Sequence, residues 1–178
     1  MTLALPIFYL SILTLFLLTL NWIIFQQIKT ILSLESQFKY FFEKSQNGIL
    51  ELEEHFAFAK ICVAKKSFSR AIIESQLALK KNLNSNILDN NTIVANLYNM
   101  LGFIYCEAGQ INLAKNFYNQ ALQIDSNYVV ALNNLAKIYE DIKDFKQAES
   151  LYDQVLTIQV NNKIANRRKN LIAKMKNV

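Results

Sequence analysis

Few side chains in this chain could carry out catalysis or hold a metal ion. Cys62 and Cys106 have no second Cys or His at metal-ligand spacing, and His55 is the only histidine. No nucleophile–base pair and no phosphate-binding glycine loop occurs at a recognised spacing. We therefore expect a protein that is not an enzyme and that uses no metal and no other cofactor.

The chain instead carries one pattern of large and small residues twice, in copies 34 residues apart. The first copy consists of Tyr98, Leu101, Gly102, Tyr105, Ala114, Tyr118 and Ala121, and the second of Leu132, Leu135, Ala136, Tyr139, Ala148, Tyr152 and Val155. The first, second and fourth residues of each copy are spaced at i, i+3 and i+7, so they lie on one face of a helix. The small residues allow the two helices of a hairpin to approach closely. The pattern resembles the tetratricopeptide repeat, a helix–turn–helix unit of 34 residues.

A weaker copy precedes these two. Aligning Ala71 with Ala114 places His55 and Cys62 at large-residue positions, so we expect both to pack in the core rather than to react. The three predicted repeats cover residues 52–85, 95–128 and 129–162. The extra residues 86–94 are rich in polar turn formers and are predicted to form a loop. Alternatively, Asn90 or Asn91 could cap an earlier start of the next helix.

The N-terminal stretch from Leu3 to Phe25 contains no charged side chain. As a helix it would span roughly 34 Å, enough to cross a hydrocarbon core of about 30 Å. No basic residue precedes it and no small-residue cleavage site follows it, which favours a retained anchor over a signal peptide. The first basic residues, Lys29 and Lys39, come after the apolar stretch, so the positive-inside rule predicts that the rest of the chain lies on the cytoplasmic or equivalent organellar side.

The C-terminal residues from Lys163 to Lys176 predict a final helix whose apolar residues Ile164, Leu171, Ile172 and Met175 would cover the last repeat. This stretch has no acidic residue and six basic ones: Lys163, Arg167, Arg168, Lys169, Lys174 and Lys176. The basic residues could be simply solvated, or they could bind anionic lipid headgroups. Nucleic acid is not expected as a partner, because no aromatic residue interleaves the charges for base stacking.

Together these features predict an all-α fold. We expect an N-terminal transmembrane anchor in residues 1–25 and an amphipathic linker helix in residues 26–48. An α-α superhelix of about three tetratricopeptide repeats would follow in residues 49–162, with a basic capping helix in residues 163–178. A composition with only three Gly and one Pro suits helices.

Stacked repeats of this kind line a concave surface mainly with their first helices. The first-helix positions expected to be exposed on this protein-binding groove are Phe56, Lys60, Asn96, Asn99, Phe103, Asn133, Lys137 and Glu140. The asparagines could hydrogen-bond a peptide backbone, with Phe103 as an apolar anchor, or they could be ordinary solvated positions. In the repeat family, domains that grip a chaperone's C-terminal carboxylate use Lys, Asn and Arg side chains. Phe56 and Phe103 occupy two of those positions, so a chaperone tail is not the expected ligand.

One apolar N-terminal helix followed by about three tetratricopeptide repeats resembles the hypothetical chloroplast reading frame 37 family of plastids and cyanobacteria. Abundant Asn, Ile and Lys, which have AT-rich codons, agree with an organellar origin. The resemblance implies a photosystem I assembly factor in the thylakoid membrane, with its repeats in the stroma and photosystem I subunits or other assembly factors as partners. The same architecture would also serve a bacterial envelope assembly or secretion scaffold, or an organelle protein-import receptor.

Overall fold

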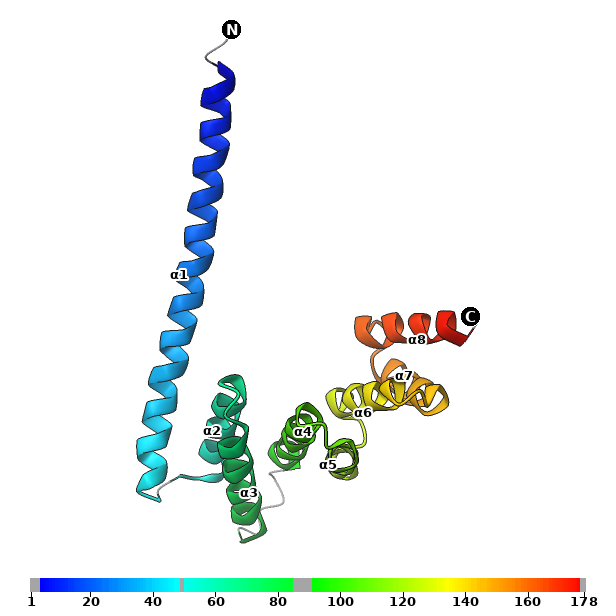
Figure 1. Ribbon diagram of the computed structural model, residues 1–178. Coiled ribbons are helices and arrows are strands. Elements are labelled where there is room, and N and C mark those ends of the chain that lie inside the picture. Colours follow the sequence, from blue (N-terminus) through cyan, green and yellow to red (C-terminus); the bar gives the residue numbers. More distant parts are fainter. Residues whose placement is uncertain (1–3, 49, 85–90, 177–178) are drawn as a thin grey trace. The chain divides into compact units, whose positions relative to one another are not determined.

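The computed structural model describes residues 4–48, 50–84 and 91–176, and within these ranges the chain forms eight helices and no strand (Figure 1). The all-α fold predicted from the sequence is confirmed. The chain divides into two compact units, residues 1–49 and residues 50–178. The first contains α1 (Ala4–Gln46), and the second contains α2 (Leu52–Ala64), α3 (Phe68–Asn84), α4 (Asn91–Glu107), α5 (Ile111–Ile124), α6 (Val129–Asp141), α7 (Phe145–Ile158) and α8 (Lys163–Lys176).

In the first unit, the described residues form one continuous helix, α1, of 43 residues, followed by a turn at residues 47 and 48. It is about 64 Å long, roughly twice the thickness of a hydrocarbon core. Among the described residues, α1 holds the one stretch that is long and apolar enough to cross a membrane. The hydroxyls of Ser11, Thr14 and Thr19 each donate to the carbonyl three residues earlier. These bonds satisfy the hydroxyls in a medium without water, so the composition of α1 suits the predicted anchor.

In the second unit the helices pack as antiparallel pairs, α2 with α3, α4 with α5, and α6 with α7, and each pair contacts the next. The small residues of the repeat pattern lie at these contacts. Ala71, Ala114 and Ala148, which hold equivalent positions in the three pairs, are completely buried. Gly102 lies so close to the Tyr118 ring that a Cβ atom there would be 2.7 Å from two ring carbons. The close approach that the sequence predicts is therefore present.

The turns between the paired helices share one geometry. Lys66, Gly109 and Lys143 occupy equivalent positions, and their φ angles are 58°, 73° and 66°, in the left-handed region. In each turn the amide of the following residue donates back to the last turn of the helix, as when the Ser67 amide donates to the Cys62 carbonyl at 2.8 Å. The corresponding bonds join Gln110 to Tyr105 and Asp144 to Tyr139. The weakly patterned first copy is thus a repeat of the same build as the other two.

Replacing Lys66 by glycine is expected to raise the free energy of unfolding of the α2–α3 pair by about 1 kcal/mol. The left-handed conformation costs an L-residue roughly 1–2 kcal/mol and costs glycine nothing. Gly109→Ala, at the equivalent turn, should lower the stability of the α4–α5 pair by a similar amount. Urea unfolding of the full chain in detergent, followed by circular dichroism, measures both changes. A loss of stability in Lys66→Gly would contradict this account of the turn.

The helix α4 begins earlier than the loop prediction allows. Residues 91–94, predicted as part of a loop, form the first turn of α4, so the alternative of an earlier helix start is confirmed and the loop prediction is wrong for these four residues. The physical reason is burial, because Val94 and Ala95 are 6% and 2% exposed and the added turn places them against the core. The remaining predicted loop residues, 86–90, lie outside the described residues.

The final helix, α8, packs on α7 and α6 and covers the end of the last repeat. Ala165 and Ile172 are completely buried there, in one cluster with Tyr152 and Val155. The predicted apolar stripe is partly wrong, because Ile164 and Met175 are 58% and 49% exposed. The helix is rotated so that the small Ala165 faces α7 in place of the larger Ile164. Two long apolar side chains of α8 are therefore left on its outer surface.

Candidate functional site

A groove with a volume of about 490 Å³ lies between α2 and α4. Five residues of the predicted protein-binding set line it, and three more apolar or small residues complete its walls. Helix α2 contributes Phe56, Lys60, Val63 and Ala64, and α4 contributes Asn96, Asn99, Met100 and Phe103. The structure thus brings together the first-helix positions of the first two repeats.

The groove is apolar with one positive charge. Phe103 is 38% exposed and Met100 is nearly buried at 8%, so Phe103 stands above a floor of apolar atoms. The Lys60 ammonium lies 5.4 Å from the centre of the Phe56 ring, a cation–π distance that holds the charge at the groove. No carboxylate is among the lining residues. This composition suits an apolar side chain next to a negative group.

The two groove asparagines already take part in bonds between repeats. The Tyr128 hydroxyl donates to Asn96 Oδ1 at 2.5 Å, and Asn96 Nδ2 donates to the Thr92 carbonyl at 2.8 Å. Asn134 Nδ2 donates to Asn99 Oδ1 at 3.0 Å. Both asparagines therefore link α4 to the next repeat. Asn99 keeps both hydrogens of its Nδ2 amide for a ligand's backbone, whereas Asn96 has one of its two engaged with Thr92.

The three predicted residues of α6 do not line this groove. Asn133 is half-buried and its Nδ2 donates to the Val129 carbonyl at 3.0 Å, within its own helix. Lys137 forms an ion pair with Asp141 one turn later. The structure places both on α6, and their proposed contact with a partner stays a prediction.

Glu140 does not have the exposure predicted for it. It is 7% exposed, accepts the Tyr152 hydroxyl at 3.1 Å and pairs with Arg168 at 3.2 Å. Burial and the neighbouring Glu140 carboxylate raise the pKa of Tyr152. Glu140 thus ties α6 to α7 and to the capping helix α8. The expectation that it faces solvent is wrong, because two partners distant in the sequence cover it.

The first repeat contains a buried ionic cluster that was not predicted from the sequence. Glu74, completely buried in α3, accepts from His55 Nδ1 at 2.7 Å and pairs with Arg70 at 2.7 Å. The i, i+4 spacing of Arg70 and Glu74 was a signal for this pair, and a histidine at a large apolar position was a second. The cluster takes the place of the stacked rings of Tyr98 and Phe117 in the next repeat, where Phe117 holds the position equivalent to Glu74.

The cysteines have the environment of packing residues. Cys62 is completely buried. Burial, and next the Glu74 carboxylate, raise its pKa to about 11. Burial also raises the pKa of Cys106, helped by Glu107. Because the thiolate is the reactive form, both thiols are less reactive at neutral pH than a solvated cysteine.

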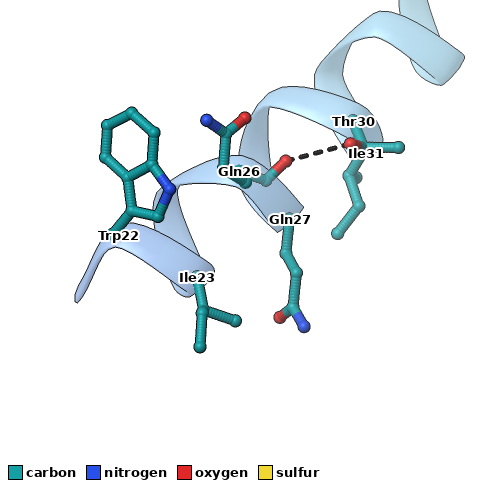
Figure 2. Close-up of a pocket in the computed structure, with 6 residues that line it drawn as sticks. All are labelled: Trp22, Ile23, Gln26, Gln27, Thr30 and Ile31. Atoms are coloured by element: carbon teal, nitrogen blue, oxygen red, sulfur yellow. Dashed lines mark hydrogen bonds between the residues drawn. The ribbon is translucent and has the colours of Figure 1, made fainter. Parts of the chain in front are cut away.

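A hollow of about 510 Å³ lies along α1, and Figure 2 shows its lining. The lining residues are Trp22, Ile23, Gln26, Gln27, Thr30 and Ile31. All six project from one helix, with the Thr30 hydroxyl bonded to the Gln26 carbonyl at 2.9 Å. A single helix cannot enclose a ligand. The hollow marks the place where the apolar stretch ends at polar side chains, with Trp22 at a position typical of a membrane interface.

Comparison with known proteins decides the family. A tetratricopeptide repeat family matches residues 94–159. Over all 178 residues the chain is 75% identical to the ycf37 protein of Pyropia yezoensis, and the match covers 100% of both chains. The chain belongs to the ycf37 family. The ycf37 protein of Porphyra purpurea is 62% identical over 131 residues, which are 74% of this chain and 76% of that protein.

The fold of this ycf37 family member matches solved repeat proteins. The crystal structure of MamA superposes with a TM-score of 0.66 at 16% identity, covering 79% of this chain and 77% of that one. At this identity the likeness concerns the fold alone. The chain is a tetratricopeptide repeat protein, a fold that serves as a scaffold for protein binding. The family name stands for hypothetical chloroplast reading frame 37, which fits a plastid protein.

Proposed function

We propose that this protein is a membrane-anchored scaffold without enzymatic activity that helps to assemble or stabilise photosystem I. It would do so by holding a segment of a photosystem subunit, or of another assembly factor, in the groove between α2 and α4. The groove carries the binding part of this proposal, because it is an apolar hollow of about 490 Å³ on a repeat scaffold. The photosystem I part rests on what the resemblance to the chloroplast reading frame 37 family implies.

The chemistry of the groove supports an extended peptide segment with one bulky apolar side chain and a neighbouring carboxylate. The apolar side chain would contact Phe103 and Met100, where burial of apolar area is worth about 25 cal/mol per Å². The carboxylate would pair with Lys60, and the Asn99 amide would donate to a backbone carbonyl. Asn96 would act indirectly, by fixing α4 against the next repeat.

The anchor supports a membrane-embedded partner. A groove tethered to the bilayer meets partners in the same bilayer at a raised effective concentration, so weak binding suffices. We place α1 in the thylakoid membrane with the repeats in the stroma. The basic residues that follow the apolar stretch, beginning with Lys29, support this orientation.

Affinity purification of the full chain from native thylakoid membranes tests the proposal. Photosystem I subunits should be enriched with the native chain, and the enrichment should fall at least about tenfold when Lys60 and Phe103 are both replaced by alanine. A loss of about 2 kcal/mol, typical of removing an interface anchor, is enough to produce this factor.

The matched control carries Leu113→Ala and Lys146→Ala, which remove one exposed apolar and one exposed basic side chain outside the groove. This control should retain photosystem I subunits as the native chain does. Equal retention by the groove variant would exclude the groove as the binding site. Recovery of precursor proteins in place of photosystem I subunits would favour an import receptor over an assembly factor.

A further inference from the structure

The basic residues of α8 fall on two different faces of the helix. Arg168 pairs with Glu140 of α6, and Lys169 pairs with Asp153 of α7. These two side chains are half-buried and hold the capping helix on the last repeat. They are therefore already neutralised by partners within the chain.

The other face of α8 presents three basic side chains to solvent. Lys163, Arg167 and Lys174 are exposed, and their spacing of four and seven residues aligns them along one side of the helix. Within the described part of the chain none of them forms an ion pair. The helix has no acidic residue that could offset them. The result is a line of three cations open to an outside partner.

An apolar line runs beside the cations. Ile164 and Met175 lie three turns apart on α8 with 58% and 49% of their surface exposed, and Val160, just before the helix, is 74% exposed. A helix face that combines cations with exposed long apolar side chains suits the interface of an anionic bilayer, where the apolar groups enter the acyl boundary and the cations contact headgroups. A polyanion in solution would leave the apolar line uncovered.

We propose that this face of α8 docks on the anionic headgroups of the membrane in which α1 is anchored. The anchor α1 makes docking easier, because a helix tethered to the membrane needs little affinity to remain at its surface. The proposal does not depend on the groove between α2 and α4 or on the partner of that groove. Each basic residue near an anionic surface favours the docked state about fivefold, which corresponds to about 1 kcal/mol. Three such residues favour docking by roughly 100-fold. Docking would hold the last repeat at the membrane surface.

The test uses the full chain reconstituted into lipid vesicles, with an environment-sensitive fluorophore on a cysteine introduced by Asn170→Cys. Asn170 is exposed between Arg167 and Lys174, and Cys106→Ser removes the more accessible native thiol. In vesicles with about one-third anionic lipid the dye should be quenched by headgroup-attached quenchers, and in neutral vesicles it should not. Salt at about 1 M, which shortens the Debye length to about 3 Å, should abolish the quenching.

The variant Lys163→Gln, Arg167→Gln and Lys174→Gln should lose the quenching in anionic vesicles. The control Lys66→Gln, Lys80→Gln and Lys146→Gln removes the same charge from three exposed positions elsewhere and should keep it. Equal quenching in neutral and anionic vesicles, or quenching that survives the α8 substitutions, would overturn the proposal. A dye response to soluble RNA or polyglutamate in detergent, with none to anionic vesicles, would overturn it in favour of a soluble polyanion.

Discussion

Replacing Tyr118 by serine is expected to lower the free energy of unfolding of the α4–α5 pair by about 4 kcal/mol. The ring is 2% exposed and fills the space beside Gly102, where no side chain is present to take its place. Loss of a buried aromatic ring costs about 3–5 kcal/mol, because the lost transfer free energy and the cavity add. Burial raises the pKa of Tyr118, which agrees with a ring removed from water.

The Tyr118→Ser substitution should also reverse the sign of the effect that Gly102→Ala has on the free energy of unfolding. In the native chain the new Cβ would lie 2.7 Å from the ring, and overpacking of this kind costs about 1–3 kcal/mol. The third repeat carries Ala136 beside Tyr152, so a Cβ can be accommodated once the helices are placed for it, and we expect a net cost of about 1 kcal/mol. In the Tyr118→Ser background the ring is gone and there is no clash, so alanine should gain about 1 kcal/mol from its helix propensity.

The first repeat also shows that the residue sizes at these two positions are matched. Ala59 and Ser75 hold the positions equivalent to Gly102 and Tyr118, and both are completely buried. Urea unfolding of the four chains of the double-mutant cycle measures the coupling, with hydrogen exchange to locate it in α4 and α5. The same cost for Gly102→Ala in both backgrounds would show that the ring does not set the requirement for glycine at this position.

The packing could be predicted from the sequence because the same pattern of large and small residues recurs in each repeat. Ala114 and Ala148 lie 34 residues apart and are both completely buried, since the same contact is built each time. The bounds of the last helix could be predicted as well, because the sequence predicts a helix from Lys163 to Lys176 and α8 has these bounds. Periodicity identifies the face of a helix that is covered by its neighbours.

The bonds of polar side chains could not be predicted in this way. Asn96 and Asn99 meet partners 32 and 35 residues later, and Glu140 meets one 28 residues later. In the sequence these three look like exposed first-helix positions, and only the stacking of repeats brings their partners near. The rotation of α8 is a related case. Ile164 and Ala165 are adjacent, so apolar spacing alone could not decide which of them faces α7.

Glu74 is a completely buried charged residue of the first repeat, and its loss should be strongly destabilising. Glu74→Ala is expected to destabilise the α2–α3 pair by about 3 kcal/mol, because removing one partner of a buried ionic pair leaves the others without compensation. Arg70 keeps 28% of its side chain in water, which holds the cost at the lower end of the usual range. Since repeat proteins open pair by pair, the loss should be local. Amide hydrogen exchange in α2 and α3 should accelerate roughly 100-fold, the factor that corresponds to this free energy.

The matched control for this substitution is Glu53→Ala, which removes an exposed carboxylate from the first turn of α2 and should cost under about 1 kcal/mol. A second readout comes from Cys62, whose pKa the Glu74 carboxylate helps to raise. In Glu74→Ala that pKa should fall, and alkylation of Cys62 should become faster at pH 8 than in the native chain or in the control. Unchanged exchange together with unchanged alkylation would mean that the cluster adds nothing to the first repeat. Faster exchange confined to α2 and α3 would show that an ionic cluster stabilises this repeat in the place of the aromatic packing that the next one uses.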